Sequence, residues 1–497
     1  MKVAIIRRLS FLFPLLAVVI GVFGGIYAVH ADGSEHWEIP QQIPALEDYN
    51  LTPVYLSWHE SVYCFSVQKI KDQFAISISQ WKLGQGWTLP KDIFTNPLKN
   101  ELDVLDVLLE EDGTVHLILF AGDQFVANIY YSQAKIWDVD RVQAWSPLAV
   151  VGEIATPPPA GQIIRDSEGK LVVIYSGKLD GNGLYAVFSS DQGVTWSNEP
   201  SLIYATNEER LKPYSLEIIR DQNGDLHAVW SDVNINGNGD SVYYAKSQSD
   251  SKIWTADKLA VGFGTIGSYT PAITVYRNEL FVVYHNDAPT TRWMRRSKDL
   301  GRTWEPAVRL FQQIGSNGPV SFVVDSSDQL HMFFGNRIGN PAIHGMWHSQ
   351  WDGTRWFEPV AVVSGPRITD MVGESSFDPS FARAVIVEGN LIFLAWRTDP
   401  GGRPNGHWYT YEFVDSPRVT SGLSSTSMTT QLPSSTKTAP IATPEGTFQP
   451  DPSPEIFPTS SSSANNEPTV GLIVALSVIP ALAIVAVILA TRLRLHS

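Results

Sequence analysis

Cysteine is almost absent from this sequence. Cys64 is the only one among 497 residues, so no disulfide can form within the chain. Positive charge is also scarce, because 36 Lys and Arg stand against 51 Asp and Glu and give a net charge of −15. This balance disfavours a nucleic-acid partner, since neutralising phosphates needs an excess of Lys and Arg, and it suits a soluble extracellular surface. We expect Cys64 to be a buried apolar residue on an inner strand.

Aromatic residues, glycine and proline are plentiful, as a protein of many short strands and turns requires. One short pattern, S-x-D-x-G-x-x-W, occurs twice about a hundred residues apart. In a tight hairpin the Asp would cap backbone N–H groups, the Gly would adopt a positive φ, and the Trp would pack between neighbouring sheets. The two copies consist of Ser189, Asp191, Gly193 and Trp196, and of Ser297, Asp299, Gly301 and Trp304.

Weaker repeats extend the pattern along the chain. Degenerate copies of the hairpin end at Trp87, Trp137, Trp254 and Trp356. A second repeat, in which a polar turn joins two apolar runs, begins near residues 54, 104, 161, 214, 271, 319 and 382. A spacing of roughly 50–60 residues is typical of a four-stranded propeller blade. The sequence therefore predicts an all-β propeller of seven blades, with six as the alternative, in which residues 37–40 supply the outer strand of the last blade.

The S-x-D-x-G-x-x-W copies are Asp-box, or BNR, repeats, and over most of residues 36–415 the chain resembles the sialidase-like β-propellers. The resemblance implies a propeller fold. It also implies a site in which three arginines hold an acidic sugar, while a Tyr nucleophile with its Glu partner and an Asp acid/base act on it. The first of those arginines belongs to an F-R-I-P motif. Here the corresponding stretch is Trp37-Glu38-Ile39-Pro40, so Glu38 stands where the arginine would be and sialidase catalysis is not expected.

The two ends of the chain predict a cell-surface protein. Residues 1–31 have the basic and then apolar character of a signal peptide, with an uncleaved anchor as the alternative. The propeller ectodomain is expected over 32–415, followed by a Ser/Thr/Pro-rich disordered stalk over 416–468. A transmembrane helix is expected over 469–491 and a short basic cytoplasmic tail over 492–497. The predicted topology is single-pass type I, with the propeller outside the cell.

A ligand site is expected on the face where the connections between blades converge. Carboxylates and guanidinium groups gathered in such loops suit binding of a sugar, and the paired N–H donors of arginine suit an anionic sugar. The ordinary explanation is that loop tips are polar in any protein. The catalytic candidates are Glu208, Asp232, Asp287 and Asp399. The candidate ligand-binding residues are Arg210, Arg292, Arg337 and Arg397.

One loop also resembles a cation-binding segment. Asp232, Asn234 and Asn236 precede Gly237 in the spacing of the first half of a calcium loop, and Asp240 could supply a further oxygen. Tyr243 occupies the twelfth position, so the loop is not an EF-hand. Calcium is therefore one possibility for this loop and an ordinary Asn/Gly-rich turn is the other. No other cofactor is indicated.

Two classes of function fit these observations. The first is a non-catalytic propeller that binds an extracellular glycan or glycoprotein. This class is favoured because the sequence contains no well-defined catalytic motif. The alternative is an exo-sialidase or another glycoside hydrolase in which two carboxylates of the loop face act together.

Overall fold

The structure is a computed structural model, which describes a single unit of the chain. The described residues are 36–46, 51–70, 73–96, 101–122, 127–153, 155, 159–206, 211–234, 239–247, 254–261, 269–286, 291–315, 317–336, 344–364, 379–398 and 406–419. The chain divides into two compact units, 1–433 and 434–497, and all described residues belong to the first. The predicted signal peptide, transmembrane segment and tail, and all but the first residues of the stalk, lie outside them. Along the described residues, no helix has the length and hydropathy needed to span a bilayer.

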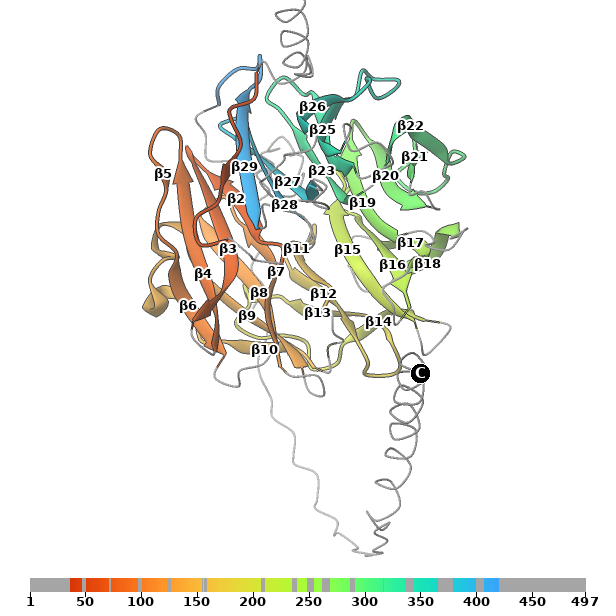
Figure 1. Ribbon diagram of the computed structural model, residues 1–497. Helices are drawn as coiled ribbons and strands as arrows, with labels where there is room; N and C mark the ends of the chain where they lie inside the picture. Colours follow the sequence, from red (N-terminus) through yellow and green to blue (C-terminus); the bar gives the residue numbers. More distant parts are fainter. Residues whose placement is uncertain are drawn as a thin grey trace, which may run out of the picture. The chain divides into compact units, whose positions relative to one another are not determined.

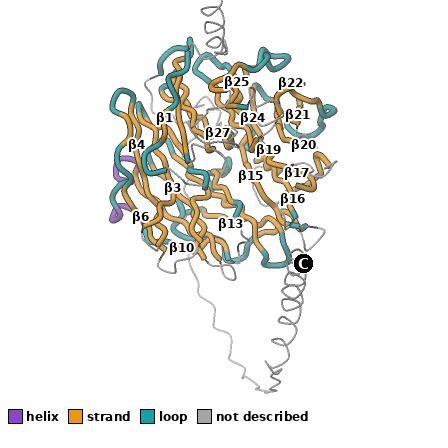
Figure 2. The backbone as a smooth tube through the Cα atoms, in the orientation of Figure 1, coloured by secondary structure: helices purple, strands orange, loops and turns teal. Residues whose placement is uncertain are grey.

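Seven antiparallel sheets form a closed ring (Figure 1). The innermost strands contact one another in the order β2, β7, β11, β15, β19, β23, β27 and then β2 again. Only two short 3-10 turns, η1 (Ile136–Asp138) and η2 (Val142–Ala144), interrupt the strands and loops of the described chain (Figure 2). The prediction of an all-β propeller with seven blades is confirmed.

Each blade is a meander whose first strand lines the axis of the ring. Blade 1 contains β2 (Val54–Trp58), β3 (Ser61–Ile70), β4 (Gln73–Lys82), β5 (Gly86–Trp87) and β6 (Lys91–Asn96). Blade 2 contains β7 (Glu101–Leu109), β8 (Thr114–Gly122), β9 (Ala127–Lys135) and β10 (Ala149–Gly152). Blade 3 contains β11 (Gly161–Arg165), β12 (Leu171–Gly177), β13 (Gly183–Ser189) and β14 (Ser201–Ala205). Blade 4 contains β15 (Lys212–Arg220), β16 (Leu226–Val233), β17 (Gly239–Ser247) and β18 (Trp254–Val261).

The remaining three blades follow the same plan. Blade 5 contains β19 (Tyr269–Tyr276), β20 (Glu279–Asn286), β21 (Thr291–Ser297) and β22 (Val308–Gly315). Blade 6 contains β23 (Asn317–Val324), β24 (Leu330–Asn336), β25 (Gly345–Gln350) and β26 (Val360–Ser364). Blade 7 contains β27 (Pro379–Val387), β28 (Leu391–Thr398), β29 (His407–Phe413) and, from the opposite end of the chain, β1 (Gln41–Gln42).

The amino-terminal segment closes the ring as its outermost strand. Gln41 and Gln42 pair with Tyr409 and Trp408 of β29, and the Glu38 N–H donates to the Tyr411 carbonyl at 3.0 Å. The strand pairing therefore reaches slightly beyond residues 37–40, where it was predicted. Because the last blade combines both ends of the chain, neither end can leave without exposing a sheet edge.

The two sides of the ring differ in their connections. On one side, which we call the turn side, lie the hairpins between the first and second strands of each blade. Neighbouring hairpins contact each other there, since Arg277 bonds to Asp328 and the Ser326 N–H donates to the Gly389 carbonyl at 2.8 Å. On the other side, which we call the mouth side, the chain passes from blade to blade.

The last described residues run along the turn side. The Val419 N–H donates to the Glu388 carbonyl at 2.7 Å, and the Ser416 hydroxyl donates to Asp325 at 2.5 Å. At the amino-terminal end, Glu38 pairs with Tyr411 near the end of β29, and that end of β29 lies beside the β27–β28 hairpin, since Phe413 pairs with Leu391. Both ends of the described propeller are therefore on the turn side.

Apolar side chains fill the space between neighbouring blades, and one tryptophan per blade packs toward the blade before it. Trp196 lies 5.0 Å from Tyr131 of blade 2, and Trp304 lies 4.9 Å from Tyr244 of blade 4, both as ring-centroid distances in edge-on geometry. Trp37 stands in the same relation to Phe333 of blade 6. We call the seven residues the blade tryptophans: Trp37, Trp87, Trp145, Trp196, Trp254, Trp304 and Trp356. Cys64 is fully buried in such a cluster, as expected for a structural thiol.

The two S-x-D-x-G-x-x-W segments form turns with the same hydrogen bonds. In the first, the Gly193 N–H donates to the Ser189 hydroxyl and the Thr195 N–H donates to Asp191, both at 2.8 Å. The second copy repeats both distances with Ser297 and Asp299. Gly193 has a φ of +84°, and a Cβ there would lie 2.1 Å from the Tyr131 hydroxyl, so the residue must be glycine.

Candidate functional site

A cavity of about 450 Å³ occupies the axis of the ring. Residues from all seven inner strands line it, so it is the central channel of the propeller. Toward the turn side the lining is largely aliphatic and includes Ile219, Val323 and Val385. Its middle and mouth carry the polar groups Asp103, Asp106, Gln162, Tyr214, Glu217, Arg383 and Arg397.

A belt of polar side chains joins consecutive inner strands halfway along the channel. Asp106 accepts a hydrogen bond from the Ile163 N–H of the next blade at 3.0 Å. Gln162, which precedes Ile163, accepts a hydrogen bond from a backbone N–H of blade 4. Glu217 of blade 4 likewise accepts one from the Ile273 N–H of blade 5 at 3.0 Å. Ser321 accepts from the Ala384 N–H at 2.9 Å. The equivalent position is thus filled by Asp106, Gln162, Glu217, Ala272, Ser321 and Arg383 in blades 2 to 7.

Ala272 has no polar side chain at this position, and Arg383 departs from the belt as well, because its guanidinium cannot accept a hydrogen bond from a backbone N–H. Within the described part of the chain, its one hydrogen bond goes to the Ala382 carbonyl at 3.4 Å. Its positive charge acts on the carboxyl groups of both Asp106 and Glu217 and lowers their pKa values, although burial has the larger, opposite effect on each. The belt therefore places one cation among carboxyl groups from two other blades.

Burial raises the pKa values of three carboxyl groups of the channel toward neutrality. The pKa of Asp103 is about 7, through burial above all and also through the nearby charge of Glu101. Burial likewise raises the pKa of Asp106 to about 6 and that of Glu217 to about 7. Near pH 7 these groups can either donate or accept hydrogen bonds, which is unusual for carboxylates and typical of functional cavities.

A second arginine and a tyrosine lie toward the mouth. The Arg397 guanidinium stacks 4.1 Å from the centroid of the Phe381 ring, which fixes it at the channel wall. Burial raises the pKa of Tyr214, whereas Arg397 and Arg383 lower it, so the phenol stays protonated beside two cations. Arg383 and Arg397 both come from blade 7, and the carboxyl groups come from blades 2 and 4. The channel therefore carries its basic groups on the wall of blade 7 and its carboxyl groups on the walls of blades 2 and 4.

Of the residues singled out from the sequence, Arg397 is the one that lines this cavity. Arg292 is fully buried and donates to the carbonyls of Gly318 and Gly335, both at 3.3 Å, which suits a structural contact between blades 5 and 6. Glu208, Arg210, Asp287, Arg337 and Asp399 lie outside the described residues.

The predicted cation loop is described only in part. Asp232 is fully buried, and one of its oxygens accepts from the Tyr204 hydroxyl at 2.5 Å. Burial raises its pKa to about 6, with a smaller contribution from Asp240, which itself accepts from the Ser241 hydroxyl. Asn236 lies outside the described residues. Among the residues that the structure does describe, no group of three His, Cys, Asp or Glu side chains is arranged to hold a metal ion.

Sequence analysis missed the channel residues Asp103, Asp106, Tyr214, Glu217 and Arg383. A signal for them existed, because each is a polar residue of an inner strand with a buried residue directly beside it in the sequence. The candidate site residues were chosen from loops instead, because loop residues carry function in most folds. Position 38 also needs correction. Glu38 lies at the outer edge of blade 7, three strands from the channel, so its charge has no bearing on a clamp there.

Glu217→Gln is expected to stabilise the protein above neutral pH. The pKa of Glu217 rises from 4.5 to about 7 on folding. The stabilising contribution of its protonated carboxyl to the free energy of unfolding is therefore fully present below pH 4.5 and is lost as the pH rises through 7. A glutamine can keep the bond to Ile273, as Gln162 does for the next blade, without the cost of a buried charge. Urea unfolding at pH 8 should show a gain of about 1–2 kcal/mol, discounted for water in the channel.

The reverse exchange is the control. Gln162→Glu places a carboxyl at the equivalent belt position and should lose stability over the same range of pH. Equal stability of Glu217→Gln and the native chain at both pH 4.5 and pH 8 would contradict the assignment of a buried, mostly protonated carboxyl.

Comparisons with known proteins identify no family for this chain. No protein-family model matches the chain, and no curated protein matches its sequence. A Dyadobacter fermentans protein of unknown function is 15% identical, with 63% of this chain and 96% of that chain covered and a TM-score of 0.40. A Trypanosoma rangeli sialidase in complex with sialic acid is 12% identical, covering 67% and 56%, with a TM-score of 0.38. An ulvan lyase is 11% identical, covering 78% and 96%, with a TM-score of 0.47. At such identities and TM-scores, nothing about activity follows.

Proposed function

We propose that this propeller binds an acidic carbohydrate, free or on a glycoprotein, at the mouth of its central channel, without sialidase catalysis. Arg383 and Arg397 hold the acidic group, and the protonated carboxyl groups of Asp103 and Glu217 with the Tyr214 hydroxyl take the sugar hydroxyls. Guanidinium groups match carboxylate and sulfate geometry by paired N–H donors, which makes them suited to this role.

The observation that carries the proposal is the position of Arg383. A belt position that accepts a backbone N–H in blades 2, 3, 4 and 6 holds a guanidinium in blade 7, with one long hydrogen bond to a carbonyl and no ion pair among the described residues. Arg383 is half-buried, and a cation that is partly withdrawn from water is costly unless an anion accompanies it, so a ligand anion would complete the site. The cavity of about 450 Å³ is within the range of small-ligand sites.

We further propose that this binding takes place at the cell surface. The amino-terminal and carboxyl-terminal sequences support a type I membrane protein with an extracellular propeller, as argued from their composition. The net charge of −15 speaks against a nucleic-acid ligand.

A second candidate is hydrolysis of a glycosidic bond. It is favoured by the three channel carboxyl groups, whose raised pKa values of about 6 and 7 suit a general acid paired with a base. The two candidates differ in one respect, because a hydrolase needs the carboxyl groups for turnover and a binding protein needs the arginines for affinity.

Titration of the purified full-length protein with acidic and neutral oligosaccharides tests the proposal. Arg383→Ala should weaken binding of a sialylated or sulfated oligosaccharide by about a hundredfold. Arg418→Ala is the matched control, since Arg418 is an exposed arginine paired with Glu388 on the turn side.

Three outcomes separate the candidates. Loss of binding in Arg383→Ala but not in Arg418→Ala supports the proposed site. Retention of full affinity in Arg383→Ala and Arg397→Ala refutes it. Turnover of a fluorogenic α-sialoside that disappears in Asp103→Asn and Glu217→Gln would establish the hydrolase instead.

A further inference from the structure

Trp137 is the one tryptophan of this protein that is exposed. All sixteen tryptophans lie in the described part of the chain, and the other fifteen are buried or half-buried. Trp137 has 59% of its surface exposed. From its place after Ser132 in a degenerate hairpin repeat, this residue was expected to pack between blades like Trp196 and Trp304. Its exposure therefore needs an explanation.

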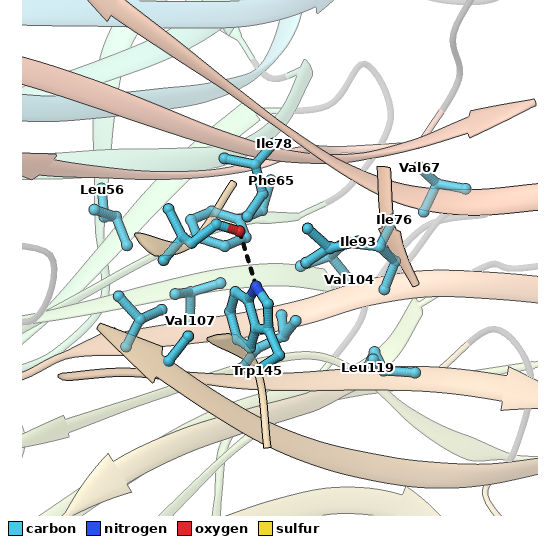
Figure 3. Packing of buried hydrophobic residues seen from close by; sticks show 14 of the residues in the cluster. Leu56, Phe65, Val67, Ile76, Ile78, Ile93, Val104, Val107, Leu119 and Trp145 are labelled. Carbon is cyan, nitrogen blue, oxygen red and sulfur yellow. Dashed lines mark hydrogen bonds between the residues drawn. The ribbon is translucent and has the colours of Figure 1, made fainter. Parts of the chain in front are cut away.

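A second tryptophan occupies the interior position in blade 2. Trp145, eight residues further on, is 7% exposed and packs against Phe65 and Phe94 of blade 1 (Figure 3). Its indole N–H donates to the Val139 carbonyl at 2.8 Å. The longer turn of blade 2, which contains η1 and η2, thus supplies its own blade tryptophan. Trp137 has no remaining part in the packing between blades.

The exposed indole is nevertheless held in place. Gly113, in the hairpin between β7 and β8, packs closely against the six-membered ring, since a Cβ there would lie 2.5 Å from one carbon of that ring. The Lys135 ammonium lies over the ring, 5.8 Å from its centroid. It donates to the Asp112 carboxylate at 2.7 Å, to the Asp112 carbonyl at 3.2 Å and to the Thr114 hydroxyl at 2.7 Å. On the following residues, Arg141 is paired with Asp138. A fixed aromatic ring is therefore bordered by polar groups that can form hydrogen bonds.

We propose that Trp137 is a second carbohydrate site, at which a neutral pyranose stacks its apolar face on the indole. The exposed carboxylate of Asp112, which Lys135 holds in place, accepts hydrogen bonds from hydroxyl groups at the edge of the sugar. A rigid aromatic ring supplies contact area at low entropic cost, and polar groups around it fix orientation. The ligand class is a chain of neutral hexoses, because one ring of such a chain covers one indole.

The surroundings favour a sugar over a lipid or a protein. The two basic residues beside the ring are matched by two acidic ones, so no excess of positive charge is available for an anionic membrane. The apolar patch consists of Trp137 with Val142 close by in sequence, which is far smaller than the roughly 800 Å² per partner of a stable protein interface.

This site is independent of the channel. Trp137 follows β9 and contacts the β7–β8 hairpin, so it lies on the turn side, whereas Arg397 lies toward the mouth. The inference goes beyond the proposed channel function and does not depend on it.

Fluorine NMR of the full-length protein labelled with 5-fluorotryptophan tests the proposal residue by residue. The Trp137 resonance is assigned as the one missing in Trp137→Phe. Cellohexaose, chitohexaose and mannohexaose are titrated separately into the millimolar range. We expect at least one of them to shift the Trp137 resonance saturably, while the blade tryptophans stay unchanged. The affinity measured by calorimetry should fall at least about tenfold in Trp137→Ala.

Each other result overturns the site. The proposal fails if none of the three hexasaccharides moves the Trp137 resonance, or if Trp137→Ala binds as tightly as the native chain. It also fails if phosphatidylserine-containing vesicles shift that resonance and the sugars do not, which would indicate a membrane contact. Arg397→Ala should leave the titration unchanged, so failure of the channel proposal would be seen separately.

Discussion

Deletion of residues 36–46 is expected to lower the free energy of unfolding of the whole propeller by about 5–10 kcal/mol. The segment contributes three buried side chains, because Trp37, Ile43 and Leu46 are 8%, 0% and 1% exposed. It also covers the outer edge of β29, through hydrogen bonds at Glu38 and Ile43. Since the ring is continuous, opening blade 7 weakens every neighbouring interface. Urea unfolding followed by far-ultraviolet circular dichroism measures the loss.

Two substitutions within the same segment serve as controls. Ile43→Ala should account for about 2–4 kcal/mol of the loss. Ile39→Ala should change stability by less than about 0.5 kcal/mol, because Ile39 is 79% exposed. A deletion variant that unfolds at the same urea concentration as the native chain would contradict closure by this strand.

Trp145→Ala should destabilise the propeller by about 3–5 kcal/mol, whereas Trp137→Ala should have almost no effect. The Trp145 ring fills the space between blades 1 and 2 among Phe65, Val104 and Val107 (Figure 3). Its removal leaves a cavity and an unbonded Val139 carbonyl. Chemical denaturation of both variants at one pH gives the comparison.

A conservative exchange refines this test. Trp145→Phe retains most of the packing but loses the hydrogen bond to Val139, so it should cost less than the alanine variant. If Trp137→Ala proves as destabilising as Trp145→Ala, then the assignment of Trp145 as the blade tryptophan is incorrect.

Repeats in the sequence predicted the propeller because a blade is a local structure. Its turns and alternating strands lie within about 50 consecutive residues, so residue spacing alone reveals it. The closing strand could also be predicted, since Trp37 and Glu38 resemble Trp304 and Glu305. The blade tryptophan of blade 2 was misidentified, because Trp137 fits the repeat and Trp145 stands in a longer turn whose path the spacing does not specify.

The channel was harder to predict, because it is assembled from strands hundreds of residues apart. Asp106, Glu217 and Arg383 each look like an isolated polar residue in an apolar strand. Their equivalence becomes visible only in the structure, where Asp106 and Glu217 accept from Ile163 and Ile273 of the following blades. Arg383 is placed at the same level because the N–H of the next residue, Ala384, donates to Ser321. Arg397 was predicted because it ends an inner hairpin, a feature that single-sequence reasoning can detect.

The course of the carboxyl-terminal segment has a practical consequence for presenting this protein to ligands. Residues 414–419 are bonded to the β27–β28 hairpin and to Asp325, on the turn side. If the chain is attached to a sensor surface through an affinity tag placed after residue 419, its attachment point therefore lies on the side opposite the mouth. The channel would then remain open even to a bulky glycoprotein, whereas Trp137 would face the support. Immobilising the protein in this way would report on the channel, and free solution is required to detect binding at Trp137.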